Sequence, residues 1–203
     1  MTARRPAHSL TVPLALMGLA AGLVTVLGVD FVHGLDRHGL LLATRYTARV
    51  SFVFFMAVYL ARPLAEATQA ALPIAMLRQR RGLGVSFAMA HSVHLAALLA
   101  YFTLTTAKAP LVIALIGGFG YVLLLLMALT SNTPAQRALG ARWKALHTVG
   151  LHTLWTIFTL TLALQLLNHA ADPAQRAVML SVSLAGLGLR FSLAARRLQA
   201  AAA

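Results

Sequence analysis

Four histidines lie inside long apolar stretches of this 203-residue sequence: His91, His94, His147 and His152. An ionisable side chain is costly to place inside an apolar helix, so each of these positions needs a reason. The sequence contains no cysteine, which excludes disulfides, thiolate ligands and iron–sulfur clusters. Methionine and tyrosine can also ligate haem iron, but those inside the apolar stretches are not paired in any telling way, which leaves neutral histidine as the plausible strong ligand. One histidine from each of two helices could hold a six-coordinate haem, which transfers single electrons.

Helical geometry limits which of these histidines can act together. His91 and His94 are three positions apart, so they lie about 60° apart around a helix and share a face. His147 and His152 are five positions apart, or about 140°, so we expect only one of them to face the third span, residues 83–106, and the other to bond a carbonyl or a polar neighbour. Small residues flank both pairs and would let a porphyrin approach, although they are equally typical of ordinary helix–helix packing. They are Ala90, Ala97, Gly140 and Gly150.

The composition indicates that membrane-spanning helices position these histidines. The sequence is 60% hydrophobic and 10% charged, whereas soluble domains carry about 25% charged residues. Six apolar blocks are long enough to span a membrane, which takes about 20 residues. They cover residues 10–31, 45–64, 83–106, 110–130, 141–167 and 176–193. We expect residues 1–203 to form a single all-α domain, an integral membrane six-helix bundle whose neighbouring helices pack antiparallel.

The basic residues indicate how the bundle is oriented. The net charge of +13 comes from short bursts between the apolar blocks, which is typical of topology signals and not of nucleic-acid binding. With the N-terminus inside, twelve basic residues lie on the inner side and five on the outer side. This bias predicts that both termini of the multi-pass protein are cytoplasmic. The first block follows Arg4 and Arg5 and exceeds the usual signal-peptide core of about 7–15 residues, so we expect it to be retained.

Two short segments carry helix-start signals. Thr133-Pro134-Ala135-Gln136 predicts a hydroxyl N-cap at Thr133, a first-turn proline and a capping-box glutamine. Asp172-Pro173-Ala174-Gln175 repeats this pattern before the last block. We expect the segment 68–77, which contains Pro73, to be a short interfacial stretch.

Two motifs surround the candidate histidines. The run Arg80-Arg81-Gly82-Leu83-Gly84-Val85, followed by His94-Leu95, resembles a segment of the ferric-reductase-like transmembrane family. Leu129-Thr130-Ser131-Asn132, Arg137-Ala138-Leu139-Gly140 and Trp143-Lys144-Ala145-Leu146-His147 resemble a segment of one branch of that family. This branch is the haem-binding membrane subunit of bacterial periplasmic methionine-sulfoxide reductase systems. The resemblance covers roughly residues 45–165.

The resemblance implies a six-helix bundle that carries haem b between His94 and His147, in preference to His91 and His152. It implies a multi-pass protein of a bacterial inner membrane, an electron-transfer subunit of a membrane oxidoreductase that is not a complete enzyme by itself. Electrons would come from a cytoplasmic flavin such as FMN, or from a membrane quinol, the reduced form of a quinone. They would pass to an acceptor on the outer side, such as a periplasmic reductase. Charged groups near the cytoplasmic ends of the ligand helices could bind haem propionates or a flavin phosphate, or else membrane lipid headgroups. They are Arg80, Arg81, Arg142 and Lys144.

The sequence also departs from the family pattern. Family members often carry further histidines where this chain has Leu160 and Lys108, which favours one haem over two. A small polytopic transporter or membrane scaffold without haem is the alternative function, although intramembrane histidines without acidic partners make a poor proton path. A self-contained ferric reductase is disfavoured, because the sequence has no flavin or nicotinamide domain.

Overall fold

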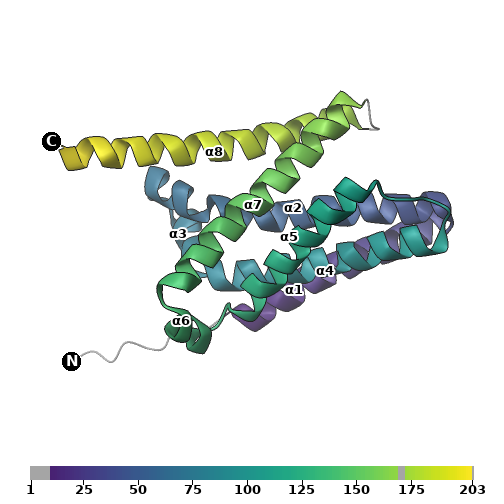
Figure 1. Cartoon of the computed structure of the whole chain (residues 1–203), viewed down its shortest axis with the longest axis horizontal. Helices are drawn as coiled ribbons and strands as arrows, with labels where there is room; N and C mark the ends of the chain where they lie inside the picture. The colour runs from purple at the N-terminus through teal and green to yellow at the C-terminus, as the bar shows by residue number, and fades with distance from the viewer. Residues whose placement is uncertain (1–9, 169–171, 203) are drawn as a thin grey trace. The chain divides into compact units, whose positions relative to one another are not determined.

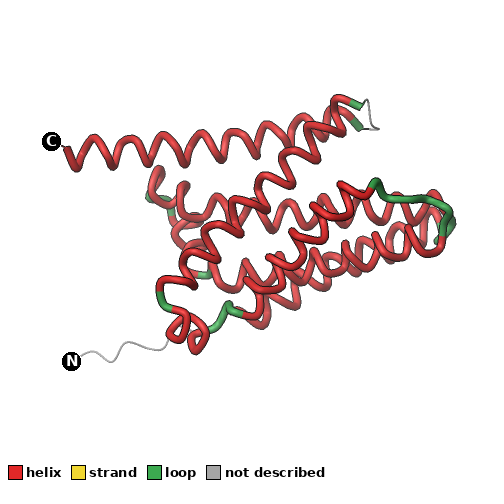
Figure 2. The backbone as a smooth tube through the Cα atoms, viewed as in Figure 1, coloured by secondary structure: helices red, strands yellow, loops and turns green. Residues whose placement is uncertain are grey.

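The computed structural model describes residues 10–168 and 172–202, and all regular structure in these ranges is α-helical (Figures 1 and 2). Arg4 and Arg5, on which part of the predicted orientation rests, lie outside the described residues. The helices are α1 (Thr11–His33), α2 (Arg37–Thr68), α3 (Ala71–Arg78), α4 (Arg80–Leu104), α5 (Leu111–Leu129), α6 (Thr133–Leu139), α7 (Ala141–Leu167) and α8 (Pro173–Ala202).

Six of the helices in the described ranges are long and apolar enough to cross a membrane: α1, α2, α4, α5, α7 and α8. The all-α class and the six predicted spans are therefore confirmed, and the chain is a multi-pass membrane protein. Large apolar side chains cover the outward faces, as in α5, where Val112, Leu115 and Phe119 are more than half exposed. Hydrocarbon is the solvent that such faces require. The cytoplasmic placement of both termini stays a prediction.

Two spans belong to helices that are longer than their apolar blocks. The predicted span 45–64 lies within α2 (Arg37–Thr68), and the span 176–193 lies within α8 (Pro173–Ala202). Asp36 explains the early start of α2, because its carboxylate accepts the Gly39 N–H at 2.8 Å, as an N-cap residue does. Hydropathy finds the part of a helix that lipid surrounds, whereas backbone hydrogen bonds continue into the polar turns beyond it.

One predicted helix cap, that of the short helix α6 before α7, is wrong. The N-cap of α6 is Asn132 and not Thr133, since the Asn132 side chain accepts the Ala135 N–H at 2.8 Å. Pro134 lies in the first turn, as expected. Asparagine is the better N-cap of the two neighbouring candidates, which accounts for the shift by one residue. Gly140 then separates α6 from α7 with a φ of 50°, a conformation that favours glycine.

The contacts between residues group the chain into two compact units. The first contains Met1–Val58 and Ala75–Ala107, and the second contains Tyr59–Ile74 and Lys108–Ala203. The first unit thus holds α1, α4 and most of α2, and the second holds α5 to α8 together with the last turns of α2. His91 and His94 lie in the first unit, and His147 and His152 lie in the second.

In the first unit, α1 packs directly against α4. Gly18 faces the backbone of Ser86, and Gly22 faces Val93, whose Cβ would lie 2.8 Å from a Cβ built on the glycine. In these two contacts the residue numbers rise together in both helices, so α1 and α4 run parallel, as the first and third spans of a membrane protein must. The ring contact between Phe55 and Phe87, with centroids 5.3 Å apart, belongs to the antiparallel pairing of α2 with α4.

Valine at Gly18 is expected to destabilise the protein by about 1–3 kcal/mol, because its Cβ would overlap the Ser86 carbonyl. Thermal unfolding of the detergent-purified protein measures this change. Gly28→Val is the matched control on the same helix, since no atom lies within 4 Å of the Cβ position at Gly28. Equal melting temperatures for the two variants would contradict the close packing of α1 and α4.

In the second unit, α7 packs against both α5 and α8. Trp155 donates its indole N–H to the Ser183 carbonyl at 3.1 Å, and the hydroxyls of Thr159 and Ser183 are 2.6 Å apart. Nearer the connection of α7 to α8, Arg176 donates to the Gln165 amide oxygen at 2.8 Å. Along these contacts the residue numbers rise in α7 and fall in α8, so the two helices run antiparallel, as consecutive spans should.

Candidate functional site

His94 of α4 is held by the neighbouring helix α2. Its Nδ1 lies 3.1 Å from the hydroxyl of Thr47, a fully buried residue. The Thr47 hydroxyl donates to the Ala43 carbonyl at 2.6 Å, one turn earlier in α2. A hydroxyl has a single proton, so once Ala43 receives it, the Thr47 oxygen can only accept a hydrogen bond from His94.

This arrangement assigns the tautomer of His94. Its Nδ1 carries the proton and donates to Thr47, so its Nε2 carries the lone pair. Histidines that bind metal through one nitrogen almost always donate the other N–H to a protein acceptor, which fixes both tautomer and ring orientation. His94 therefore has the hydrogen-bonding state of a ligating histidine.

His91 lies beside His94 on the same face of α4, as their spacing predicts. The two ring centroids are 5.1 Å apart, and the His91 ring also contacts Phe87, with centroids 5.3 Å apart. Helical spacing alone thus placed both rings together, and the Thr47 contact distinguishes His94 from His91.

His147 in α7 is held in a different way. Its Nε2 lies 3.1 Å from the Thr130 hydroxyl, and that hydroxyl donates to the Leu126 carbonyl at 2.7 Å. By the same proton count, His147 donates from Nε2 to Thr130. Its ring also stacks on Trp143, with centroids 4.1 Å apart. Ligation of iron through Nε2 requires the ring to leave Thr130.

The residues of the second motif contact one another around Thr130. Trp143 donates its indole N–H to the Thr130 carbonyl at 2.8 Å, while His147 bonds the Thr130 hydroxyl. Asn132, two positions later, caps α6. The motif that carries the resemblance is therefore also a structural cluster that fixes the end of α5 to the start of α7.

His152 contacts other residues than His147 does, as an angular separation of about 140° requires. Which of the two faces the third span stays a prediction. The His152 ring meets Tyr59 edge-on, with centroids 5.9 Å apart, and it lines a pocket near the ends of α2 and α8. His94 and His147 lie in different units, so their pairing across a haem stays a prediction. In the described residues, no group of three or more His, Asp or Glu side chains is arranged around a metal position.

The four predicted cofactor-binding basic residues lie at helix starts. Arg80 and Arg81 begin α4 in the first unit, and Arg142 and Lys144 lie in the first turn of α7 in the second unit. Arg81, Arg142 and Lys144 are exposed, and Arg80 is partly buried. Their cofactor contacts stay a prediction.

Sequence reasoning missed Thr47, the contact of Thr130 (a residue of the second motif) with His147, and a pocket with several charged residues. A polar residue just inside the start of the second apolar block, residues 45–64, is the signal that could have found Thr47. For the pocket, the signal was the four-residue spacing of Arg62 and Glu66, which is typical of a helical ion pair.

No protein-family model and no solved structure matches this chain. The resemblance to ferric-reductase-like proteins therefore rests on the motifs alone.

Proposed function

We propose that this chain is the haem b-containing electron-transfer subunit of a bacterial inner-membrane oxidoreductase, with His94 and His147 as axial ligands of one haem. It takes electrons from a cytoplasmic flavin or a membrane quinol and passes them to an acceptor on the outer side, such as a periplasmic reductase. The observation that carries the proposal is the hydrogen bond from His94 Nδ1 to Thr47, which leaves Nε2 as a ligand inside a membrane-spanning helix.

The hydrogen bonding of His94 suits haem ligation, whereas His147 suits it only after its side chain changes rotamer. Thr47, itself fixed by Ala43, holds the His94 imidazole in the neutral Nδ1–H tautomer and limits its rotation. At His147, Thr130 occupies Nε2, so the side chain must change rotamer to ligate. When bound, a haem with two histidine ligands supplies one-electron transfer without an open coordination position.

Apolar residues lie close to His94 in α4. Phe87 lies against His91, and Ala90 is fully buried one turn before His94. An apolar surround excludes water, and it sets the dielectric that tunes a bound redox group. Arg80, Arg81, Arg142 and Lys144 would supply charge-assisted partners for propionates or a flavin phosphate.

The direct test is the reduced-minus-oxidised absorption spectrum of the detergent-purified protein from a haem-replete host. We expect a b-type signal at one haem per chain, measured by haem extraction against protein concentration. Protein that purifies folded and without haem would overturn the proposal and would favour a transporter or scaffold.

Valine at Thr47 is expected to lower haem affinity about 10- to 100-fold, because it removes the acceptor of the His94 Nδ1–H. Haem titration of the apoprotein gives the affinity, and a redox titration gives the accompanying change in midpoint potential. Thr47→Ser keeps the oxygen and is expected to restore both values.

Thr25→Val is the matched control for this variant, because Thr25 also donates to a carbonyl one turn earlier, that of Ala21. Unchanged affinity in Thr47→Val, or an equal loss in Thr25→Val, would remove Thr47 as the residue that positions His94.

A further inference from the structure

A pocket of about 260 Å³ lies in the second unit, between the last turns of α2 and the C-terminal half of α8. Arg62 and Glu66 of α2 and Arg190 and Arg197 of α8 line it, and His152 of α7 completes the polar part of its wall. None of the four charged residues was singled out as a binding residue from the sequence.

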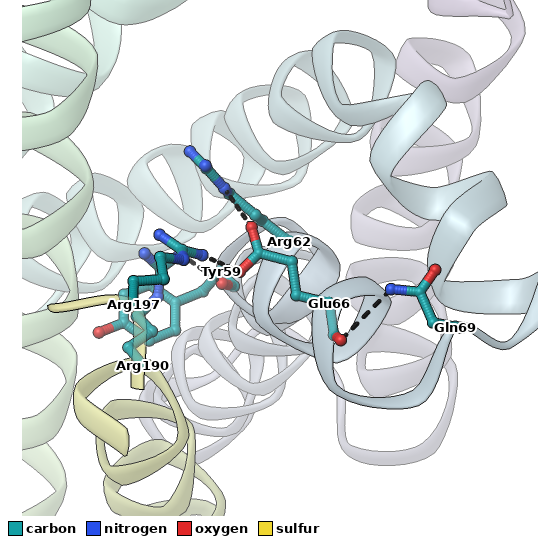
Figure 3. A network of polar contacts seen from close by, with 6 residues as sticks. All are labelled: Tyr59, Arg62, Glu66, Gln69, Arg190 and Arg197. Carbon is teal, nitrogen blue, oxygen red and sulfur yellow. Dashed lines mark hydrogen bonds and ion pairs between the residues drawn. The ribbon is translucent and has the colours of Figure 1, made fainter. Parts of the chain in front are cut away.

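The charges in this pocket do not balance. Arg62 donates from Nε to the Glu66 carboxylate at 2.8 Å, and Arg197 forms an ion pair with the other oxygen of the same carboxylate (Figure 3). Arg190 donates instead to the Tyr59 carbonyl, and its guanidinium lies 4.1 Å from the centroid of the Tyr59 ring. Three arginines and one glutamate therefore leave two positive charges in excess.

Asp172, the other acidic side chain of the second unit, is too far along α8 to neutralise them. The sequence has four acidic residues in total. Asp30 and Asp36 belong to the first unit, and Asp172 precedes the first residue of α8, 18 positions before Arg190. At 1.5 Å per residue, that helical distance is about 27 Å, well beyond a Debye length of about 8 Å.

The remaining wall of the pocket is apolar. Leu187, Phe191 and Leu193 of α8 line it beside the arginines. Arginine is the side chain best suited to phosphate, because its planar donors bind two oxygens at once. A phosphate next to an apolar surface, at the polar end of membrane-spanning helices, is the chemistry of an anionic phospholipid headgroup.

We propose that this pocket binds a phosphate-bearing anion, with Arg190 and Arg197 as the principal contacts and Glu66 as a competing internal anion. An anionic phospholipid is the ligand with this chemistry and an apolar tail, and a soluble phosphate compound shares the chemistry of the head. The site is independent of the haem, so it stands or falls separately from the proposed function.

The excess of positive charge predicts the sign of each variant's effect on anion binding. Glu66→Gln removes the internal anion and is expected to tighten binding of phosphatidylglycerol about threefold, while Arg197→Gln weakens it about fivefold. Glu66 keeps Arg62 as a partner in the second variant. Arg196→Gln is the matched control, because Arg196 is the exposed neighbour that does not line the pocket, and binding should stay within about twofold.

The experiment is native mass spectrometry of the detergent-purified full chain, titrated with phosphatidylglycerol and, separately, with zwitterionic phosphatidylcholine. We expect phosphatidylglycerol to bind in preference to phosphatidylcholine, with the order Glu66→Gln, wild type, Arg197→Gln. Competition by inorganic phosphate at millimolar concentration, with the same dependence on Arg197, would support the anion site and assign it to a soluble phosphate. Circular dichroism verifies that each variant is folded.

Two results would overturn the proposal. One is an equal loss in Arg196→Gln and Arg197→Gln, which indicates a diffuse surface charge. The other is weaker binding in Glu66→Gln as well as in Arg197→Gln, which is expected if the arginines and Glu66 form only a structural ion-pair network.

Discussion

Alanine at His94 is expected to abolish the b-type signal of the purified protein. In the proposed function, its Nε2 is the nitrogen that binds iron, because the Nδ1–H is used in the bond to Thr47. If His94 is an axial ligand, its removal takes away one of the two iron–protein bonds, so we expect haem content to fall to background. Haem extraction and the reduced-minus-oxidised spectrum measure this loss.

His91→Ala is the matched control, because His91 lies three positions away on the same face and its ring contacts that of His94. We expect this variant to keep its haem. A reversed result, with haem lost in His91→Ala and kept in His94→Ala, would transfer the ligand role to His91. Haem retained in both variants would exclude α4 as the source of an axial ligand.

The second large effect is expected at His147. If this residue is the other axial ligand, His147→Ala converts the six-coordinate low-spin haem to a five-coordinate high-spin form, or releases it. Electron paramagnetic resonance of the oxidised protein distinguishes the low-spin from the high-spin state. His152→Ala should leave the spectrum unchanged, since His152 faces Tyr59 and the pocket.

Thr130 makes this test more specific. Thr130→Val removes the oxygen that holds His147 Nε2, so we expect the low-spin signal to persist or strengthen if His147 ligates iron. If His147 serves only to fasten α7 to the end of α5 through Thr130 and Trp143, both His147→Ala and Thr130→Val would lower the melting temperature. The low-spin signal would then persist in His147→Ala, which contradicts the ligand assignment.

The sequence alone determined the number and type of elements. Six apolar blocks predicted six long helices, because the length of a membrane helix is set by the thickness of the hydrocarbon core. Angular spacing correctly brought His91 beside His94 and turned His152 away from His147, because 100° per residue is a local property of the helix. Helix ends were less accurate, as at Asn132, because neighbouring residues compete for the same cap.

Only the tertiary structure decided which residues hold the candidate ligands. Thr47 lies 47 positions from His94, and no local pattern connects the two. The pocket at Arg190 depends on contacts across 131 positions, between Arg190 and Tyr59, which helix periodicity cannot supply. Periodicity determines the face on which a residue lies, whereas packing between helices determines what that face meets. For this protein, periodicity in the sequence identified the candidate histidines. Packing between helices assigned the tautomer of His94 and revealed the unbalanced charge beside Glu66.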